Sequence, residues 1–348
     1  MSVSWIAIEP LDTISARDGR PFDAGASAGE PISHSSGVMP STALGAAWSA
    51  YAMPRNEYDK SLTFVGPIAA TQSEGTVRAF FPWPSDVVVD DDDLYGRLTV
   101  AEPLAEQSSA PTPKLLVSEW DSPLGMVTDA GSMTAYLAGG IPSVCLTSIL
   151  HSDFHIGLQR QDRVAVDSML YGAEHLRLEE GGFYVGRIRR NGNRLAPGGH
   201  LARLGGEGRL AEFTVLDNPV PMPEAPDHFP DGRLLLYLAS PAIWSDGWKP
   251  PTPEHATLEA ASVDGPLPVA MWGKTANAAN ASGAPDLDRP FVLRWAVTAG
   301  SVYYYRFATE VAAKKFSKRW HDRCYTQAEG RLRTAGYGWC FTGTWKEN

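Results

Sequence analysis

The chain has 348 residues, of which 43% are hydrophobic and 20% are charged. This composition predicts one large globular domain or two of ordinary size, and the 33 glycines and 27 prolines predict many loops. The formal net charge of −10 argues against a protein that coats nucleic acid indiscriminately. No apolar run is long enough to cross a bilayer, and the first residues lack the features of a signal peptide. We therefore expect a cytoplasmic protein with no membrane partner.

Charge is distributed unevenly along the chain. Residues 84–107 carry seven acidic side chains against one arginine. Residues 184–210 carry six arginines against one glutamate, and residues 306–333 carry eight basic side chains against three acids. Because salt screens charges beyond about 10 Å, each run acts on its own neighbourhood. The basic runs are compatible with a localised anion site in an acidic protein.

The first part of the chain has the pattern strand, helix, strand, strand. The expected strands cover residues 3–8, 62–67 and 77–84, and the expected helix covers residues 40–52. Pro40 near the helix start, with Ser41 or Thr42 as the cap, predicts the N-terminus of that helix. This order of elements begins a ferredoxin-like domain.

The next part combines an insertion with further strands. Residues 85–118 are acidic, contain prolines and show little periodicity, so they predict a loop-like insertion in which disorder is expected. Residues 133–137 predict a helical turn, residues 155–178 a long β-hairpin, and residues 183–190 and 210–216 two strands.

A proline-rich linker then separates a second half. Strands are expected over 233–239, 269–272, 291–297, 301–307 and 337–345, with a basic helix over 308–323. The predicted fold is α+β, with two open-faced, ferredoxin-like (RRM-like) halves and long loops. The expected boundaries are 1–218 for the N-terminal domain, 219–231 for the linker and 232–348 for the C-terminal domain.

A glycine-rich loop over residues 198–209 is the strongest local signal. Glycine backbone can present N–H groups to an anion, and Arg203 and Arg209 in the loop carry guanidinium groups that suit phosphate. The loop matches neither G-x-x-x-x-G-K-[ST] nor a G-x-G-x-x-G that opens a helix, so the common nucleotide-binding motifs are not supported. A plain surface turn remains the alternative interpretation.

Candidate metal ligands and catalytic groups are sparse. His151, Asp153 and His155 would share one face of a strand, but no fourth ligand follows by spacing. The aspartates 90–93 would point in different directions, which suits a solvated loop better than an octahedral Mg²⁺ site. His34 could act in RNA cleavage as a general acid or base, yet no partner can be placed beside it. We expect no metal, no cofactor and no catalytic residue.

The cysteines lead to the same expectation. Cys145, Cys324 and Cys340 are odd in number and widely separated. This spacing predicts neither a disulfide framework nor a zinc site made of cysteine pairs.

Several motifs together resemble one family. They are WIAIEPLDTISARDGRPFDAG, LTFVGPI, FFPWP, IGLQRQDRVAVDSMLYGAEHLRL, GGEGRLAEF, AGSVYYYRF and GYGW, in this order from Trp5 to Trp339. The family is the RAMP-superfamily subunit (the Cas-five-like group) of the Cmr (type III-B) CRISPR effector complex that caps the 5′ end of crRNA. The Arg-Asp-Gly-Arg-Pro-Phe turn and the Gly-Gly-Glu-Gly-Arg loop are its most specific parts.

The resemblance implies a non-catalytic RNA-binding subunit that holds the repeat-derived 5′ tag of crRNA. It also implies a bridge between the large polymerase/cyclase-like subunit and the adjacent RAMP backbone subunit, with the inserted hairpin as a thumb, and contact with the flank of the target RNA. The implied RNA-binding residues are Arg17, Asp18, Gly19, Arg20, Arg160, Gln161, Arg163, Gly205, Gly206, Gly208 and Arg209. Arginines and backbone N–H groups would hold phosphates, and single-stranded bases would be read directly.

Two alternatives from other classes remain open. One is a metal-independent CRISPR RNA endonuclease of the RAMP superfamily that uses His34. The other is a protein-only scaffold whose arginines meet acidic partners. Cleavage of repeat RNA would favour the first, and the absence of any tag binding would favour the second.

Overall fold

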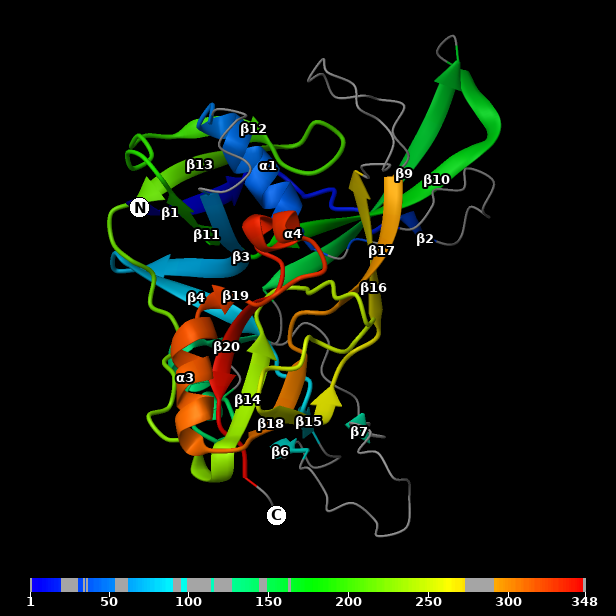
Figure 1. The fold of residues 1–348 in the computed structure, drawn as a ribbon. Coiled ribbons are helices and arrows are strands. Elements are labelled where there is room, and N and C mark those ends of the chain that lie inside the picture. Colours follow the sequence, from blue (N-terminus) through cyan, green and yellow to red (C-terminus); the bar gives the residue numbers. More distant parts are fainter. Residues whose placement is uncertain are drawn as a thin grey trace, which may run out of the picture.

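A computed structural model of the chain describes residues 2–19, 31–33, 35, 37–53, 62–89, 95–98, 114–115, 127–143, 149–161, 164–272 and 291–346. The fold is α+β, as predicted, with mostly strands and few helices. Two sheets form the body, and two long hairpins project from one side of it (Figure 1). None of the helices in these ranges is long and apolar enough to cross a membrane.

The first sheet has seven strands in the order β12-β13-β1-β11-β3-β4-β8. These are β1 (Ser2–Pro10), β3 (Leu62–Ser73), β4 (Thr76–Pro82), β8 (Val127–Asp129), β11 (Gly182–Arg190), β12 (His200–Arg203) and β13 (Leu210–Leu216). Strand β1 is central and buried on both faces. This explains why its sequence is a continuous apolar run rather than an alternating one.

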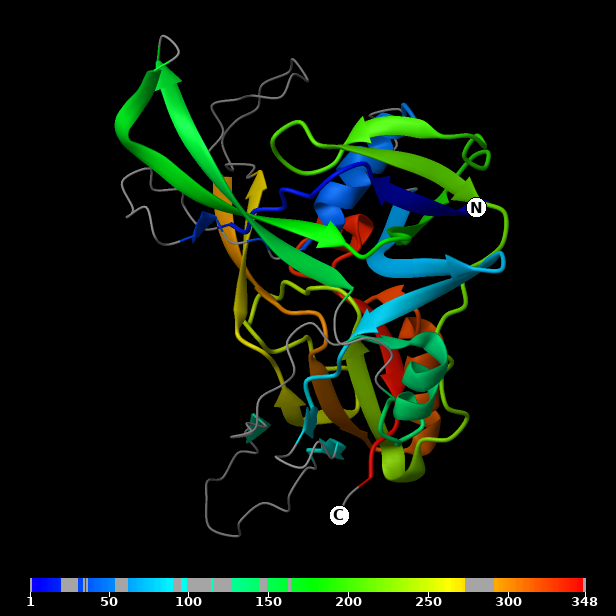
Figure 2. The same cartoon turned by 180° about the vertical axis from the view of Figure 1, so that it is seen from behind.

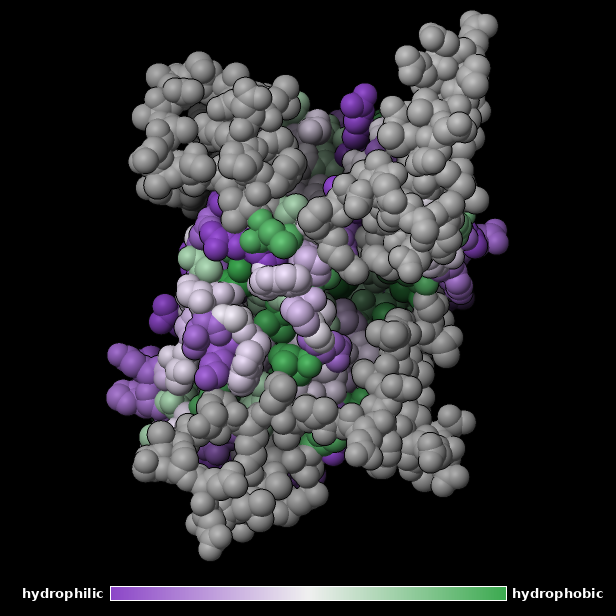
Figure 3. All heavy atoms as spheres, turned by 90° about the vertical axis from the view of Figure 1, so that its right-hand side faces the viewer, coloured by the Kyte–Doolittle hydropathy of each residue, from purple (hydrophilic) through white to green (hydrophobic). Residues whose placement is uncertain are grey.

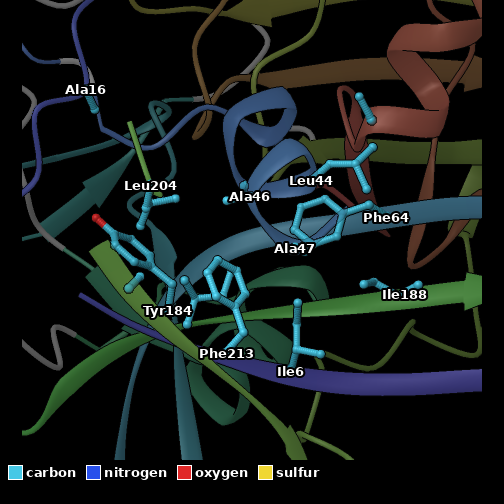
Figure 4. Packing of buried hydrophobic residues seen from close by; sticks show 14 of the residues in the cluster. Ile6, Ala16, Leu44, Ala46, Ala47, Phe64, Tyr184, Ile188, Leu204 and Phe213 are labelled. Atoms are coloured by element: carbon cyan, nitrogen blue, oxygen red, sulfur yellow. The ribbon is translucent and has the colours of Figure 1, made fainter. Parts of the chain in front are cut away.

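Helix α1 (Pro40–Ala50) covers one face of the first sheet through Ala43, Leu44 and Ala47 (Figure 4). The helix begins at Pro40, as predicted, and ends two residues earlier than the predicted Ala52. Met39 is the N-cap residue and makes no side-chain cap bond. The prediction of Ser41 or Thr42 as the cap was therefore wrong, because Pro40 already occupies the first helical position, where its missing N–H costs nothing.

The second sheet has six strands in the order β19-β20-β14-β18-β15-β7. These are β7 (Lys114–Leu115), β14 (Arg233–Leu238), β15 (Ala256–Ser262), β18 (Val302–Phe307), β19 (Arg323–Cys324) and β20 (Trp339–Gly343). A 3-10 turn (Pro230–Gly232) precedes β14, and helices α3 (Glu310–Trp320) and α4 (Gly330–Ala335) follow β18. The side chain of Thr309 caps α3 by accepting a hydrogen bond from the Ala312 amide.

Both sheets contain four strands in the same spatial order relative to the chain: fourth, first, third, second. In the first sheet this set is β13-β1-β11-β3, and in the second it is β20-β14-β18-β15. Helix α1 connects the first and second strands of one set, whereas α3 connects the third and fourth strands of the other. The two halves therefore share strand order but keep different helices.

The two sheets pack against each other through a shared hydrophobic cluster, so they are not open-faced as predicted. Trp5, Val65 and Phe81 from the first sheet lie in the same buried cluster as Trp339 and Phe341 from the second. The face of the first sheet opposite α1 is thereby covered by the C-terminal half. The domain boundaries stay a prediction, because this cluster joins the halves whereas a further buried cluster consists only of residues from 229–340.

The acidic stretch 85–118 departs from the sequence prediction where it is described. It contains β5 (Val87–Val89), β6 (Tyr95–Arg97) and β7, and β7 pairs in parallel with β15 of the second sheet. Asp86 is fully buried. Its carboxylate accepts hydrogen bonds from Tyr136 (2.6 Å) and Tyr304 (2.5 Å) and pairs with Arg97 at 2.8 Å. The aspartates 90–93 lie outside the described residues.

This buried group holds three parts of the chain together. Tyr136 belongs to helix α2 (Ala130–Leu137), Tyr304 to β18, and Arg97 to β6. Burial, followed by the neighbouring charge of Asp86, raises the pKa of Tyr136, and both also raise the pKa of Tyr304. Both phenols thus remain protonated donors to the carboxylate. Asp86 lies in an acidic stretch that the sequence predicts to be a loop, but in the structure it is a buried anchor that connects β6, α2 and β18.

The two hairpins lie beside each other on one side of the body (Figure 2). One consists of β9 (Leu150–Gln161) and β10 (Val164–Leu178), with the short β2 (Pro31–Ser33) along β10. The other consists of β16 (Pro266–Trp272) and β17 (Phe291–Val297). On the face from which they project, exposed hydrophilic and hydrophobic residues are mixed, with no single apolar band among the coloured residues (Figure 3).

Replacing Asp86 with alanine should destabilise the fold strongly. The change leaves the Arg97 guanidinium buried without its partner and removes the acceptor of two buried phenols, which predicts a loss of about 3–5 kcal/mol. Urea unfolding measures it. Asp153→Ala removes an exposed ion pair with Arg177 and should cost at most about 1 kcal/mol. If the Asp86 variant is as stable as the Asp153 variant, the structural role assigned to Asp86 is contradicted.

Candidate functional site

Three separate parts of the chain meet at the foot of the β9–β10 hairpin. Residues 11–19, which follow β1, run between this foot and the turn that joins β12 to β13. The Ile14 amide donates to the Leu176 carbonyl at 2.7 Å, and the Leu176 amide donates to the Ile14 carbonyl at 2.9 Å. On the other side, the Gly206 amide donates to the Ser15 carbonyl at 2.8 Å. We call residues 11–19 and 204–209 the loop platform.

The glycine turn needs its glycines for different reasons. Gly205 has φ +78°, and a Cβ there would lie 2.4 Å from the Ser15 carbonyl oxygen, so only glycine allows the close approach. A Cβ at Gly206 would lie 3.2 Å from the Ser15 hydroxyl. Gly208 has φ +70°, but a Cβ there would meet no atom within 4 Å. Two glycines therefore dock the turn, and the third lies in open space.

The predicted loop over 198–209 is shorter than the sequence suggested. Residues 200–203 form β12, an edge strand that pairs with β13. The turn itself spans Leu204 to Arg209 and is closed by a hydrogen bond from the Leu204 amide to the Arg209 carbonyl at 2.9 Å. Leu204 and Ala16 are both buried in the core beneath α1 (Figure 4), so the platform is anchored to the rigid part of the molecule.

Arg209 has partners within the protein. Its guanidinium pairs with Asp12, and its Nη2 lies 3.5 Å from His175 Nδ1. The Thr13 amide, and with it the charge of Arg209, lowers the pKa of Asp12. A phosphate at Arg209 would therefore compete with a carboxylate, which the simple clamp inferred from the sequence did not include.

His175 links the hairpin to the platform. Its ring is 1% exposed and stacks on the ring of His155 with centroids 4.1 Å apart. Nδ1 lies 3.0 Å from the Thr13 hydroxyl. Nε2 lies 3.3 Å from a Glu207 carboxylate oxygen, which is an ion-pair distance but outside hydrogen-bond geometry. Burial and then His155 lower the pKa of His175, against the opposing effect of Glu207.

The first predicted turn, which is described as far as Gly19, has one exposed and one buried charged side chain. Arg17 is exposed and forms an isolated β-bridge with Ser35, whereas Asp18 is buried. The Gly19 amide donates to the Pro268 carbonyl at 2.9 Å, and a Cβ at Gly19 would lie 2.6 Å from the Ala270 nitrogen. Gly19 therefore docks this segment against the β16–β17 hairpin.

The backbone of two predicted hairpin residues lies away from the platform. Arg160 and Gln161 end β9, five or six residues beyond His155 along a strand. At about 3.4 Å per residue this places the Arg160 backbone about 17 Å further out. Arg20, Arg163 and His34 lie outside the described residues. Of the implied RNA-binding residues, Arg17, Asp18, Gly19, Gly205, Gly206, Gly208 and Arg209 therefore lie in one region.

The predicted His-Asp-His cluster has separate partners. His151 pairs with Glu179, Asp153 pairs with Arg177, and His155 stacks on His175. Over the described ranges, no group of three His, Cys, Asp or Glu side chains could hold a metal ion. Cys324 and Cys340 are free buried thiols, and burial raises the pKa of Cys324 to about 12.

Sequence reasoning missed the polar partners of the platform. Asp12, Thr13, His175 and Glu207 have no motif of their own, and His175 is 162 positions away from Thr13 along the chain. The sequence signal that could have found them is indirect, since three motifs of the resemblance carry them: the first contains Asp12 and Thr13, the hairpin motif contains His175, and the glycine motif contains Glu207. Only the fold brings them to one place.

The geometry defines an α+β protein with two sheets of the same strand order and an exposed platform of glycines and arginine. A family model described as "CRISPR-associated protein (Cas_Cmr3)" matches residues 6–345. The chain therefore belongs to this CRISPR-associated family. It is a Cmr-type RAMP-like subunit and a component of a CRISPR effector.

Solved structures resemble the chain at low identity. One is described as type III-B Cmr-beta bound to cognate target RNA, with 14% identity, TM-score 0.48 and 86% of each chain covered. A second, with cognate target RNA and AMPPnP, has TM-score 0.46 at the same identity and coverage. A Csm3-Csm4 subcomplex of the type III-A interference complex has 10% identity and TM-score 0.40, covering 88% of this chain and 94% of the other. No curated protein matches the chain in sequence.

Stability should fall as the pH falls below the ordinary pKa of histidine. A lowered pKa means that the unfolded chain binds protons before the folded one, so stability is lost as pH drops from about 6.5 toward the folded pKa. His175 and His321 both have lowered pKa values because of burial. Urea unfolding at pH 7.5 and 5.5 measures the loss.

The variant His175→Gln should reduce this pH-dependent loss, because one of the two groups no longer titrates. His151→Gln removes a histidine that is 42% exposed and should leave the loss unchanged. If the His175 variant loses as much stability between the two pH values as the wild type, the buried neutral state of His175 is contradicted.

Proposed function

We propose that the chain is the non-catalytic subunit of a type III-B CRISPR effector that holds the 5′ tag of crRNA on the loop platform. The observation that carries the proposal is the meeting of Arg17, Arg209 and an open glycine turn on one anchored surface. Phosphate contacts from arginines and backbone amides hold single-stranded RNA in position. Membership of the family supports this role.

The turn supports the proposal through its free backbone. Gly206 donates its amide to Ser15, and Leu204 and Arg209 complete the turn. Gly205, Glu207 and Gly208 are exposed, and in the described part their amides have no hydrogen-bond partner within the protein. Successive amides in such a conformation form a concave anion site.

The proposal assigns two further features. The common strand order supports reading both sheets as ferredoxin-like, RRM-like halves. The β9–β10 hairpin, which extends beyond the platform, would act as the thumb against the adjacent backbone subunit. The hairpin residues of the resemblance, Arg160, Gln161 and Arg163, would then contact RNA. The remaining proposed partners are the large polymerase-like subunit and the flank of target RNA.

A nuclease role is the weaker candidate. His155 and His175 are the only stacked histidine pair in the described residues, and Arg209 lies beside them. However, His175 is buried, and its neutral form is favoured by that burial. A buried imidazole cannot reach a ribose hydroxyl within the hydrogen-bond distance that proton transfer needs.

The platform can be tested with two matched glycine variants. Gly208→Ala should weaken binding of labelled tag RNA by about tenfold or more, because a Cβ obstructs close approach of the backbone to phosphate. Gly75→Ala is the control, since Gly75 has φ +78° and equally open surroundings in the β3–β4 turn. Both changes strain a left-handed residue by about 1–2 kcal/mol, so their melting temperatures should fall alike.

Fluorescence anisotropy at fixed salt reads the affinity, with an RNA of equal length and unrelated sequence as a second probe. If the two glycine variants bind tag RNA with equal affinity, the proposal that the platform is the binding surface is contradicted. A loss shared by both RNAs would indicate phosphate contact without tag recognition.

The purified protein should not cut repeat RNA, with Mg²⁺ or with EDTA. The physical reason is that residues 11–19 and 204–209 contain no histidine, lysine, tyrosine or cysteine that could exchange a proton near neutral pH, and that the adjacent His175 is buried. Gel analysis of labelled repeat RNA checks this. Products that disappear in His34→Ala or His175→Gln would favour the endonuclease instead.

A further inference from the structure

A cavity of about 480 Å³ lies at the seam between the two sheets. Its walls come from β3, β11, the C-terminal end of α3, β19 and α4. The volume falls within the range of small-ligand pockets. None of its lining residues belongs to the loop platform or to the β9–β10 hairpin.

The cavity is strongly basic. Six basic side chains line it against a single carboxylate, Asp322. The six are Arg187, Arg189, Lys318, Arg319, Arg323 and Arg333. Two basic runs that are more than a hundred residues apart in the sequence therefore converge on one cavity.

The single carboxylate that lines the cavity already has hydrogen-bond partners within the protein. Asp322 accepts two hydrogen bonds from Arg187, at 2.6 and 2.7 Å, and one from the Trp339 indole at 3.0 Å. Arg189 reaches the same carboxylate only at 3.9 Å. In the described part of the chain, no acid pairs with Lys318, Arg323 or Arg333. The cavity thus carries a surplus of positive charge.

Arg187, in the wall of the cavity, has one hydrogen-bond donor without an acceptor. The residue is 6% exposed, and its Nε has no hydrogen-bond partner in the described structure. The guanidinium lies 5.1 Å from the centre of the Trp5 ring, and Asp322 fixes its other two nitrogens. Burial and the neighbouring charge of Arg187 lower the pKa of Arg189. An anion in the cavity would offset the positive charge that Arg187 and Arg189 bring together.

Structural roles explain only part of this set. Lys318 and Arg319 lie in the last turn of α3, where cations favour the helix dipole, and Arg319 also lies over the Trp320 ring. Arg187 joins the two sheets through Asp322. Arg333 lies in the last turn of the short helix α4, where the same dipole effect applies. Arg189 and Arg323 have no such role, and they reach the cavity from β11 and β19.

We propose that this seam cavity binds closely spaced phosphate groups. Several arginines from different directions suit the planar, charge-assisted recognition of phosphate oxygens. The site is separate from the loop platform and does not depend on tag recognition there. The phosphates could come from single-stranded RNA or from the phosphate chain of a free nucleotide.

The test compares two double variants of the full chain. Arg189→Gln/Arg333→Gln removes two charges from the cavity and leaves the Arg187–Asp322 pair in place. Lys314→Gln/Lys315→Gln removes two charges from α3, at residues that do not line the cavity. The melting temperature of each variant without ligand checks that it is folded.

One probe is inorganic pyrophosphate, whose binding is measured by thermal shift. The other is a labelled eight-nucleotide oligouridine, whose binding is measured by fluorescence anisotropy. We expect the cavity variant to bind at least one probe about tenfold or more weakly than the wild type, whereas the control keeps wild-type affinity. For oligouridine, loss of two phosphate contacts should reduce the slope of log affinity against log salt by about 1.4.

A specific loss with pyrophosphate alone assigns the cavity to a free phosphate chain, and a specific loss with oligouridine assigns it to RNA. Equal weakening by the two double variants would show general charge attraction and overturn the proposal. Wild-type behaviour of the cavity variant with both probes would overturn it as well. Gly208→Ala should not change pyrophosphate binding, which separates this site from the platform.

Discussion

The packing of the two sheets against each other places a buried arginine at their seam, and much of the structure follows from that constraint. Arg187 of β11 cannot remain buried without a compensating charge, and Asp322 supplies it from the C-terminal half. Asp322 takes a left-handed conformation (φ 56°) between α3 and β19 to do so. The ends of α3 and the start of β19 are therefore fixed relative to the first sheet, and the basic cavity lies between them.

The loop platform depends on this rigid body in a different way. Its backbone is held by a few main-chain hydrogen bonds and by Ala16 and Leu204 in the core, whereas its outer surface combines glycines with the exposed side chains of Asp12, Arg17 and Glu207. Binding residues on loops that a rigid scaffold positions are a general arrangement. Asp12 and His175 already contact Arg209, so a phosphate bound there would have to share Arg209 with them. This competition would make the affinity of the platform for RNA sensitive to salt and pH.

The sequence predicted most strands and the glycine turn, because central strands such as β1 and β14 are continuous apolar runs and because glycine marks left-handed backbone. It missed β15 and β12 for physical reasons, since β15 is rich in alanine and β12 is a short polar edge strand. Asp86 was misjudged because neighbouring acids suggested solvent, whereas its partner Tyr304 lies 218 positions away. Local patterns thus located most of the long strands, whereas contacts between distant residues, such as that of Asp86 with Tyr304, could not be read from the sequence.

The account centres on the platform as the place where the guide RNA is held. Ultraviolet crosslinking of the protein to crRNA carrying a photoreactive base in the 5′ tag, followed by mass spectrometry of the peptides, tests this most directly. The account predicts crosslinks to peptides that contain residues 11–19 or 204–209, and their loss in Gly208→Ala but not in Gly75→Ala. Crosslinks from the tag that fall only in the second sheet, with none in either platform segment, would contradict it.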